Sequence, residues 1–85
     1  MADPIRVLIV DDEERFRETL AKLLGRHGFV VREAGSGPAA LELLGQAPCD
    51  VIVLDVKMPG MTGVDALPLL RAACPEAEVL VLTGH

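Results

Sequence analysis

Carboxylates directly follow two apolar runs of the chain, and they are the residues whose types and spacing could do chemistry. Asp11 and Asp12 follow the run at residues 5–10, and Asp55 follows the run at residues 51–54. Runs this apolar predict strands buried on both faces, which are typical of a parallel sheet. Ligands of open parallel sheets bind outside the carboxyl ends of the strands, where the strand order reverses. If these two strands are neighbours, three carboxylates meet there and can bind a hard divalent cation, with Mg²⁺ the expected ion.

Each carboxylate also has a purely structural explanation. An Asp before a helix can be its N-cap and interacts favourably with the helix dipole, which would account for one of Asp11 and Asp12. Two adjacent acids followed by Glu13 and Glu14 repel one another, however, and a cation would relieve that repulsion. Asp55 at the edge of an apolar core costs desolvation energy unless it is paired or coordinated. Hydrogen bonds from loop amides are the alternative to a metal there.

Strands that alternate with short helices must position these carboxylates. The hydrophobic pattern predicts strands at residues 5–10, 29–34, 51–55 and 79–83, and helices at residues 13–27, 39–44 and 64–73. Gly28 suits the end of the first helix, Pro38 fits the first position of the second, and Thr62 is expected to cap the third. Pro68 lies inside the third helix, where we expect a kink or a late helix start. This alternation predicts an α/β fold with a parallel sheet and right-handed crossovers.

Composition limits the classes of function. The chain has 85 residues, enough for one domain at most, and its hydrophobic fraction of 51% supports a packed core. A net charge of -5 argues against direct binding to nucleic acid or to an anionic membrane. Cys49 and Cys74 have neither metal nor redox spacing and are expected to be buried thiols in a reducing compartment. With no membrane-spanning stretch and no signal segment, we expect a cytoplasmic protein.

Taken together, the motifs at three strand ends resemble the receiver domain of two-component response regulators. They are Val-Asp-Asp-Glu after the first strand, Asp55 followed by Met-Pro-Gly-Met-Thr-Gly at residues 58–63, and Thr-Gly-His at residues 83–85. The resemblance covers the whole chain. It implies a doubly wound parallel sheet of the flavodoxin-like type with strand order 2-1-3-4, in which the first and third strands are adjacent.

The resemblance also implies roles for the site residues. Asp55 would be the phosphoacceptor, phosphorylated by a sensor histidine kinase or a small phosphodonor. Asp12, Asp55 and the backbone carbonyl of Lys57 would bind Mg²⁺ directly, and Asp11 would bind it directly or through water. Thr83 would be the switch hydroxyl that moves to a phosphoryl oxygen. An ionised carboxylate can form an acyl phosphate, and its transfer step needs mainly positioning and charge neutralisation.

Receivers of this type continue through a fourth helix, a fifth strand and a fifth helix. We therefore expect residues 1–85 to be a receiver domain that is incomplete at its C-terminus. The fifth-strand lysine that binds the phosphoryl group has no counterpart, because Lys22 falls on the first helix and Lys57 in a loop. Lys57 and His85 instead occupy positions that tune the lifetime of the phosphorylated state. The fourth strand would be an exposed apolar edge, so we expect self-association through it or exchange of missing elements with a partner.

Two functions from different classes follow. The first is a phosphoacceptor signalling domain, not an enzyme, that switches an output outside this chain, expected to be transcription regulation. The alternative is a phosphorylation-silent receiver fragment that acts only in self-association or protein interaction. A dehalogenase-type phosphatase would need Asp-x-Asp after the first strand, which Asp11-Asp12-Glu13 does not match. A flavin-binding protein would need a hydroxyl- and glycine-rich phosphate loop there, and the acidic run would repel a phosphate.

Overall fold

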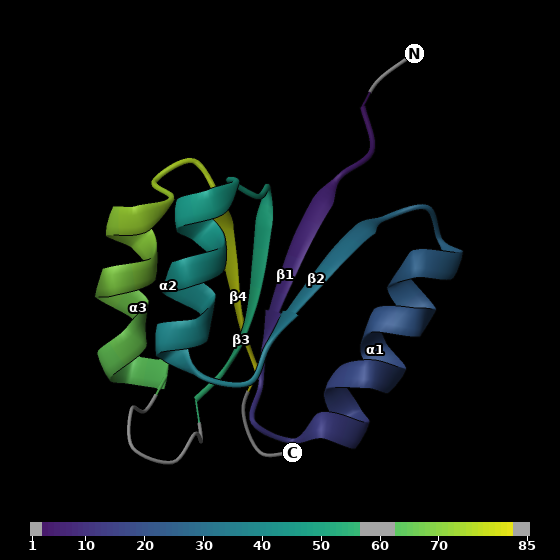
Figure 1. Ribbon diagram of the computed structural model, residues 1–85, viewed down its shortest axis with the longest axis horizontal. Helices are drawn as coiled ribbons and strands as arrows, with labels where there is room; N and C mark the ends of the chain where they lie inside the picture. Colours follow the sequence, from purple (N-terminus) through teal and green to yellow (C-terminus); the bar gives the residue numbers. More distant parts are fainter. Residues whose placement is uncertain (1–2, 57–62, 83–85) are drawn as a thin grey trace.

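The structure alternates strands and helices in the predicted order (Figure 1). It is a computed structural model that describes residues 3–56 and 63–82. Its elements are β1 (Arg6–Val10), α1 (Glu14–Arg26), β2 (Val30–Ala34), α2 (Gly37–Gln46), β3 (Val51–Asp55), α3 (Gly63–Ala73) and β4 (Glu78–Leu82). Most predicted boundaries are within one residue of these. The second helix is longer than predicted at both ends.

The strands form a parallel sheet in the order β2-β1-β3-β4. Val10 of β1 is aligned with Ala34 of β2 and with Leu54 of β3, so these strands end at the same level. Asp55 of β3 is aligned with Leu82 of β4. The predicted flavodoxin-like order is therefore confirmed, and β1 and β3 are neighbours.

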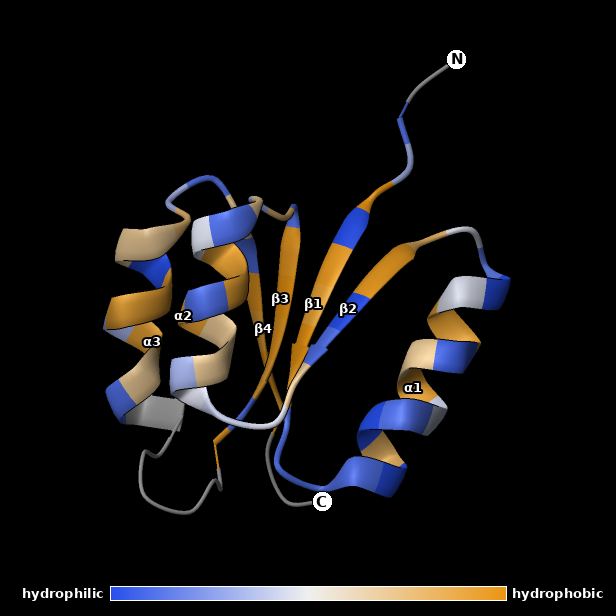
Figure 2. Ribbon diagram, in the orientation of Figure 1, coloured by the Kyte–Doolittle hydropathy of each residue, from blue (hydrophilic) through white to orange (hydrophobic). Residues whose placement is uncertain are grey.

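Helices cover both faces of the sheet, with α1 on one face and α2 and α3 on the other (Figure 1). Residues 7–10 of β1 are all buried because alternate side chains point into the two cores. Leu8 and Val10 pack on the side of α2 and α3, whereas Val7 and Ile9 pack on the side of α1. Figure 2 shows these hydrophobic central strands between the helices. Burial on both faces agrees with the continuous apolar runs in the sequence.

The end of α1 confirms the role predicted for Gly28. This glycine has a positive φ of 90°, a conformation that costs glycine little. Its N–H donates to the Gly25 carbonyl at 3.1 Å, and the N–H of Phe29 donates to the Leu24 carbonyl at 3.2 Å. This pair of bonds is a Schellman motif, which satisfies carbonyls at the helix end. It turns the chain directly into β2.

The starts of α2 and α3 correct two predictions. Ser36 is the N-cap of α2, and its hydroxyl accepts from the N–H of Ala39 at 3.2 Å, so Pro38 is the second helical residue and not the first. The helix α3 begins at Gly63 and contains Pro68, so of the two alternatives expected at this proline, the late helix start was wrong. Burial of Ala66 and Leu70 against the core holds this helix on both sides of the proline. The proposed cap Thr62 lies outside the described residues.

The strand β4 lies at one edge of the described sheet. Leu80 and Val81 expose 56% and 44% of their surface. The apolar side chains expected at this edge are therefore accessible in the described part of the chain. Within residues 3–56 and 63–82, no helix is both long enough and hydrophobic enough to cross a membrane.

Candidate functional site

Three carboxylates meet at the carboxyl ends of β1 and β3. Asp11 and Asp12 directly follow β1, and Asp55 is the last residue of β3. One carboxylate oxygen from each residue lies within 4.8 Å of the other two. The parallel pairing of β1 with β3 produces this convergence, because both strands end at the same level.

Burial differs within the cluster. Asp11 and Asp55 expose only 1% and 4% of their surface, whereas Asp12 is exposed. Asp11 and Asp55 therefore form the buried part of the site, and Asp12 lies on its solvent-exposed side. Low dielectric around the two buried groups strengthens electrostatic interactions with them. Entry from solvent is open at Asp12.

Hydrogen bonds orient Asp11 on both its main chain and its side chain. Its N–H donates to the Ala34 carbonyl at 3.0 Å, which ties it to the end of β2. Its Oδ1 accepts from the N–H of Glu13 at 2.9 Å, an Asx turn that leads the chain into α1. The N-cap position of α1 is Glu13, which makes no side-chain cap bond. Neither aspartate is the N-cap, so capping of α1 does not explain the pair.

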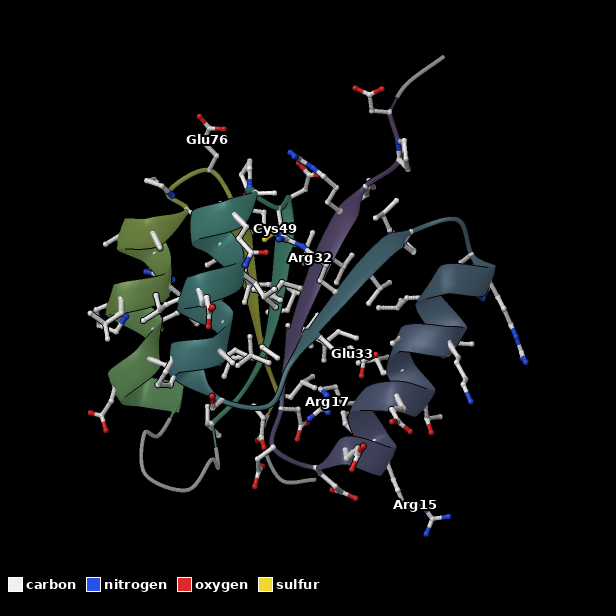
Figure 3. The ribbon with its side chains drawn as sticks, viewed as in Figure 1. Arg15, Arg17, Arg32, Glu33, Cys49 and Glu76 are labelled. Atoms are coloured by element: carbon white, nitrogen blue, oxygen red, sulfur yellow. The ribbon has the colours of Figure 1, made fainter. Side chains whose placement is uncertain are left out.

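Arg17 contacts this site, Glu33 contacts Arg17, and both residues were missed in the sequence analysis. Nη1 of Arg17 donates to the main-chain carbonyl of Asp11 at 2.9 Å, and Nε donates to Oε1 of Glu33 at 3.1 Å. Figure 3 shows the two side chains together between α1 and the sheet. The sequence offered one signal for Arg17, because it is a basic residue in a helix that begins with acidic residues.

A second ion pair links the amino-terminal ends of β1 and β3, at the opposite end of these strands from the carboxylates. Asp50 accepts from the main-chain N–H of Arg6 at 2.8 Å, and its Oδ1 accepts from Nη2 of Arg6 at 3.2 Å. These hydrogen bonds from Arg6 hold the pKa of Asp50 below its ordinary value, and they raise the pKa of Arg6. The pair links the start of β1 to the residue before β3. It therefore supports the register that brings the carboxylates together at the other end.

The donor set fits a hard divalent cation. All three side chains offer carboxylate oxygens, which Mg²⁺ and Ca²⁺ prefer over nitrogen or sulfur. Their mutual repulsion in a partly buried cluster is relieved by a bound cation. The other residues predicted for the site, Lys57, Thr83 and His85, lie outside the described residues.

Comparison with known proteins defines the family. Residues 7–85 match the response regulator receiver domain family, so the chain belongs to it. The response regulator MprA of Mycobacterium sp. (strain KMS) is 39% identical over 82 residues, covering 96% of this chain and 36% of the relative. The nitrate/nitrite response regulator protein NarP of Escherichia coli (strain K12) is 40% identical over 84 residues, covering 96% and 39%. The chain thus spans little more than a third of the length of these relatives.

Solved structures agree with this assignment. A response regulator from Burkholderia pseudomallei superposes with a TM-score of 0.90 at 36% identity, covering 95% of this chain and 48% of that one. Its crystals contained a phosphorylated aspartic acid, a calcium ion and citrate. TrrA from Thermotoga maritima, in complex with Mg²⁺ and BeF, superposes with a TM-score of 0.85 at 32% identity, covering 95% and 70%. This chain is therefore a receiver domain of two-component systems.

Proposed function

We propose that the chain is a phosphoacceptor domain in which Asp55 receives a phosphoryl group and Asp11, Asp12 and Asp55 hold Mg²⁺. The observation that carries this proposal is the convergence of three carboxylate oxygens within 4.8 Å at the ends of two adjacent strands. The phosphorylated aspartate and calcium ion in the Burkholderia relative support it. So does the complex of TrrA with Mg²⁺ and BeF.

The proposal gives different tasks to the three carboxylates. Asp55 is held rigidly as the last residue of a buried strand, which restricts the directions from which its oxygens attack phosphorus. Attack by one carboxylate oxygen on a phosphohistidine forms the acyl phosphate. The P–N bond breaks, and the departing imidazole nitrogen keeps the electron pair and takes up a proton. Asp11 and Asp12 would hold the cation beside this position, where it would supply charge neutralisation for the transferring group.

The remaining roles are extensions of the same proposal. The main-chain carbonyl of Lys57 would be a further cation ligand, and Thr83 would supply the switch hydroxyl. The alignment of Leu82 with Asp55 supports the second assignment, because Thr83 is the next residue in the chain. Lys57 and His85 tune the lifetime of the acyl phosphate. The domain acts as a substrate and switch, with no catalytic turnover of other molecules.

The proposed partner is a sensor histidine kinase, and the proposed output is transcription regulation by a region outside this chain. Support for the output comes from a relative named "Probable transcriptional regulatory protein TcrX", which is 40% identical over 81 residues. That match covers 95% of this chain and 35% of the relative. Exposure of Leu80 and Val81 at β4 supports self-association through this edge, which sedimentation velocity of the chain would measure directly.

Intact mass after incubation with Mg²⁺ and acetyl phosphate tests the phosphoacceptor. We expect one phosphoryl adduct on the wild type, none on Asp55→Asn, and an unchanged adduct on the control Asp3→Asn, which alters an exposed aspartate before β1. Excess EDTA should abolish the adduct because it removes the cation. Circular dichroism establishes that each chain is folded. A folded wild type without adduct would contradict the proposal and favour the phosphorylation-silent alternative, and an adduct on Asp55→Asn would place the modification elsewhere.

A further inference from the structure

The guanidinium of Arg17 is held between three segments beside the carboxylate cluster. It donates to the main chain after β1 through the Asp11 carbonyl at 2.9 Å, and to Glu33 of β2 at 3.1 Å. Its side chain exposes only 17% of its surface, and that of Glu33 exposes 35%. These bonds fix a long side chain that would otherwise be mobile. They also connect the start of α1 to the ends of β1 and β2 (Figure 3).

The loop after β2 leaves room for this side chain. A Cβ atom built on Gly35 would lie 3.2 Å from Nη1 of Arg17, tighter than ordinary van der Waals contact. Any larger residue at Gly35 would therefore press on the guanidinium. The absence of a side chain at this position permits the close approach that the Asp11 bond requires.

The carbonyl that Arg17 contacts belongs to the peptide group between Asp11 and Asp12. Because a peptide group is planar, a bond to its oxygen restricts the direction in which the next residue, Asp12, leaves the main chain. The N–H of Asp11 is bonded to Ala34, so the peptide groups on both sides of Asp11 are held. Asp12 is the exposed member of the cluster.

We infer that Arg17 is a positioning residue for the cation site, acting through the peptide group between Asp11 and Asp12, with Glu33 holding the guanidinium in place. This inference rests on the proposed binding of Mg²⁺. Charge alone predicts the opposite effect, since a guanidinium beside the site repels a divalent cation. The sign of the change in affinity therefore separates positioning from a simple charge effect.

Calorimetric titration with Mg²⁺ alone, without phosphodonor, tests this inference. Arg17→Met keeps most of the side-chain length but removes the donors and the charge. We expect it to bind Mg²⁺ roughly tenfold more weakly, within the range found for residues that orient metal ligands. Arg17→Lys keeps the charge but lacks the planar fork, so it should recover only part of that affinity. Glu33→Gln keeps an oxygen acceptor and should lose less than Arg17→Met.

The matched control is Arg15→Met, two residues away on the same helix and exposed (Figure 3). It removes the same charge without touching the main chain of the site, so its affinity should be unchanged or slightly tighter. Urea unfolding of every variant establishes that titrations compare folded chains, and Arg17→Lys carries the test if Arg17→Met unfolds. Equal or tighter binding by a folded Arg17 variant would overturn the inference. A wild type that fails to bind Mg²⁺ would instead overturn the proposed cation site itself.

Discussion

Replacing Asp12 with Asn should reverse the order of stability between the wild type and the variant, depending on Mg²⁺. Without a divalent cation, the carboxylate of Asp12 repels those of Asp11 and Asp55, whose oxygens lie within 4.8 Å. Asn has the same shape and no charge, so Asp12→Asn should be the more stable chain in EDTA. With Mg²⁺ in excess, the wild type gains binding energy that the variant loses.

The magnitude follows from the geometry. Two unit charges separated by 4.8 Å interact with about 0.9 kcal/mol in water and about 3.5 kcal/mol at an effective dielectric constant near 20. Asp12 is exposed but its two partners are buried, so the value in water is a lower bound, and two such pairs give at least about 2 kcal/mol. Asp12 also precedes the start of α1, and losing its attraction to the helix dipole removes about 0.5 kcal/mol. The net expected gain in EDTA is therefore at least about 1 kcal/mol.

Urea unfolding followed by far-ultraviolet circular dichroism measures both effects, since the chain has no Trp or Tyr for fluorescence. At a free Mg²⁺ concentration of about one hundred times Kd, the wild type should gain about 2.7 kcal/mol. Asp12→Asn should gain much less. The control Glu14→Gln, an exposed acid in α1 outside the cluster, should show no reversal. A variant less stable than the wild type in EDTA, or equal Mg²⁺ stabilisation of both, would refute the reasoning.

Two substitutions and the chemistry of Cys49 test other parts of the structure. Arg32 donates to three main-chain carbonyls at the end of α2 and just beyond it, so Arg32→Met should lower the free energy of unfolding by about 1–2 kcal/mol, measured in urea. Asp50→Asn should be destabilising at neutral pH, and because Arg6 depresses the folded pKa of Asp50, its difference from the wild type should disappear as the pH falls from about 4 through that lower value. Burial, with Cys74 nearby, raises the pKa of Cys49 to about 11, so its thiol should resist alkylation at pH 8 until the chain unfolds. The same shift stabilises the fold below about pH 9 and is lost as the pH rises toward 11, which pH-dependent urea unfolding measures.

Apolar runs made the central strands predictable from sequence. Residues 7–10 and 52–55 are all buried, as is typical of strands in a sheet that helices cover on both sides. The glycine at the end of α1 was equally readable, because the positive φ of Gly28 is a local requirement of the main chain. The strand order was not a consequence of these patterns. It came from the resemblance to receiver domains, since parallel crossovers alone permit several orders.

Rules based on single residues predicted the limits of α2 and α3 less well, because tertiary packing and specific hydrogen bonds also determine where a helix begins. Pro68 lacks the N–H that a helix interior uses, yet α3 continues through it, with Ala66 and Leu70 buried on either side. The start of α2 depends on the hydroxyl of Ser36, which the hydrophobic pattern does not register. In both cases the pattern indicated that a helix exists, and contacts of particular atoms determined its limits.

By itself, the sequence determined the type and succession of elements and the placement of Asp11, Asp12 and Asp55 at strand ends. These features depend on apolar periodicity and on neighbours close in the chain. Only the tertiary structure decided that Asp11 and Asp55 are buried while Asp12 is exposed, and that Arg17 bonds to the Asp11 carbonyl and to Glu33. Those contacts depend on the pairing of strands and on the path of a loop, which bring together atoms from segments that the sequence separates.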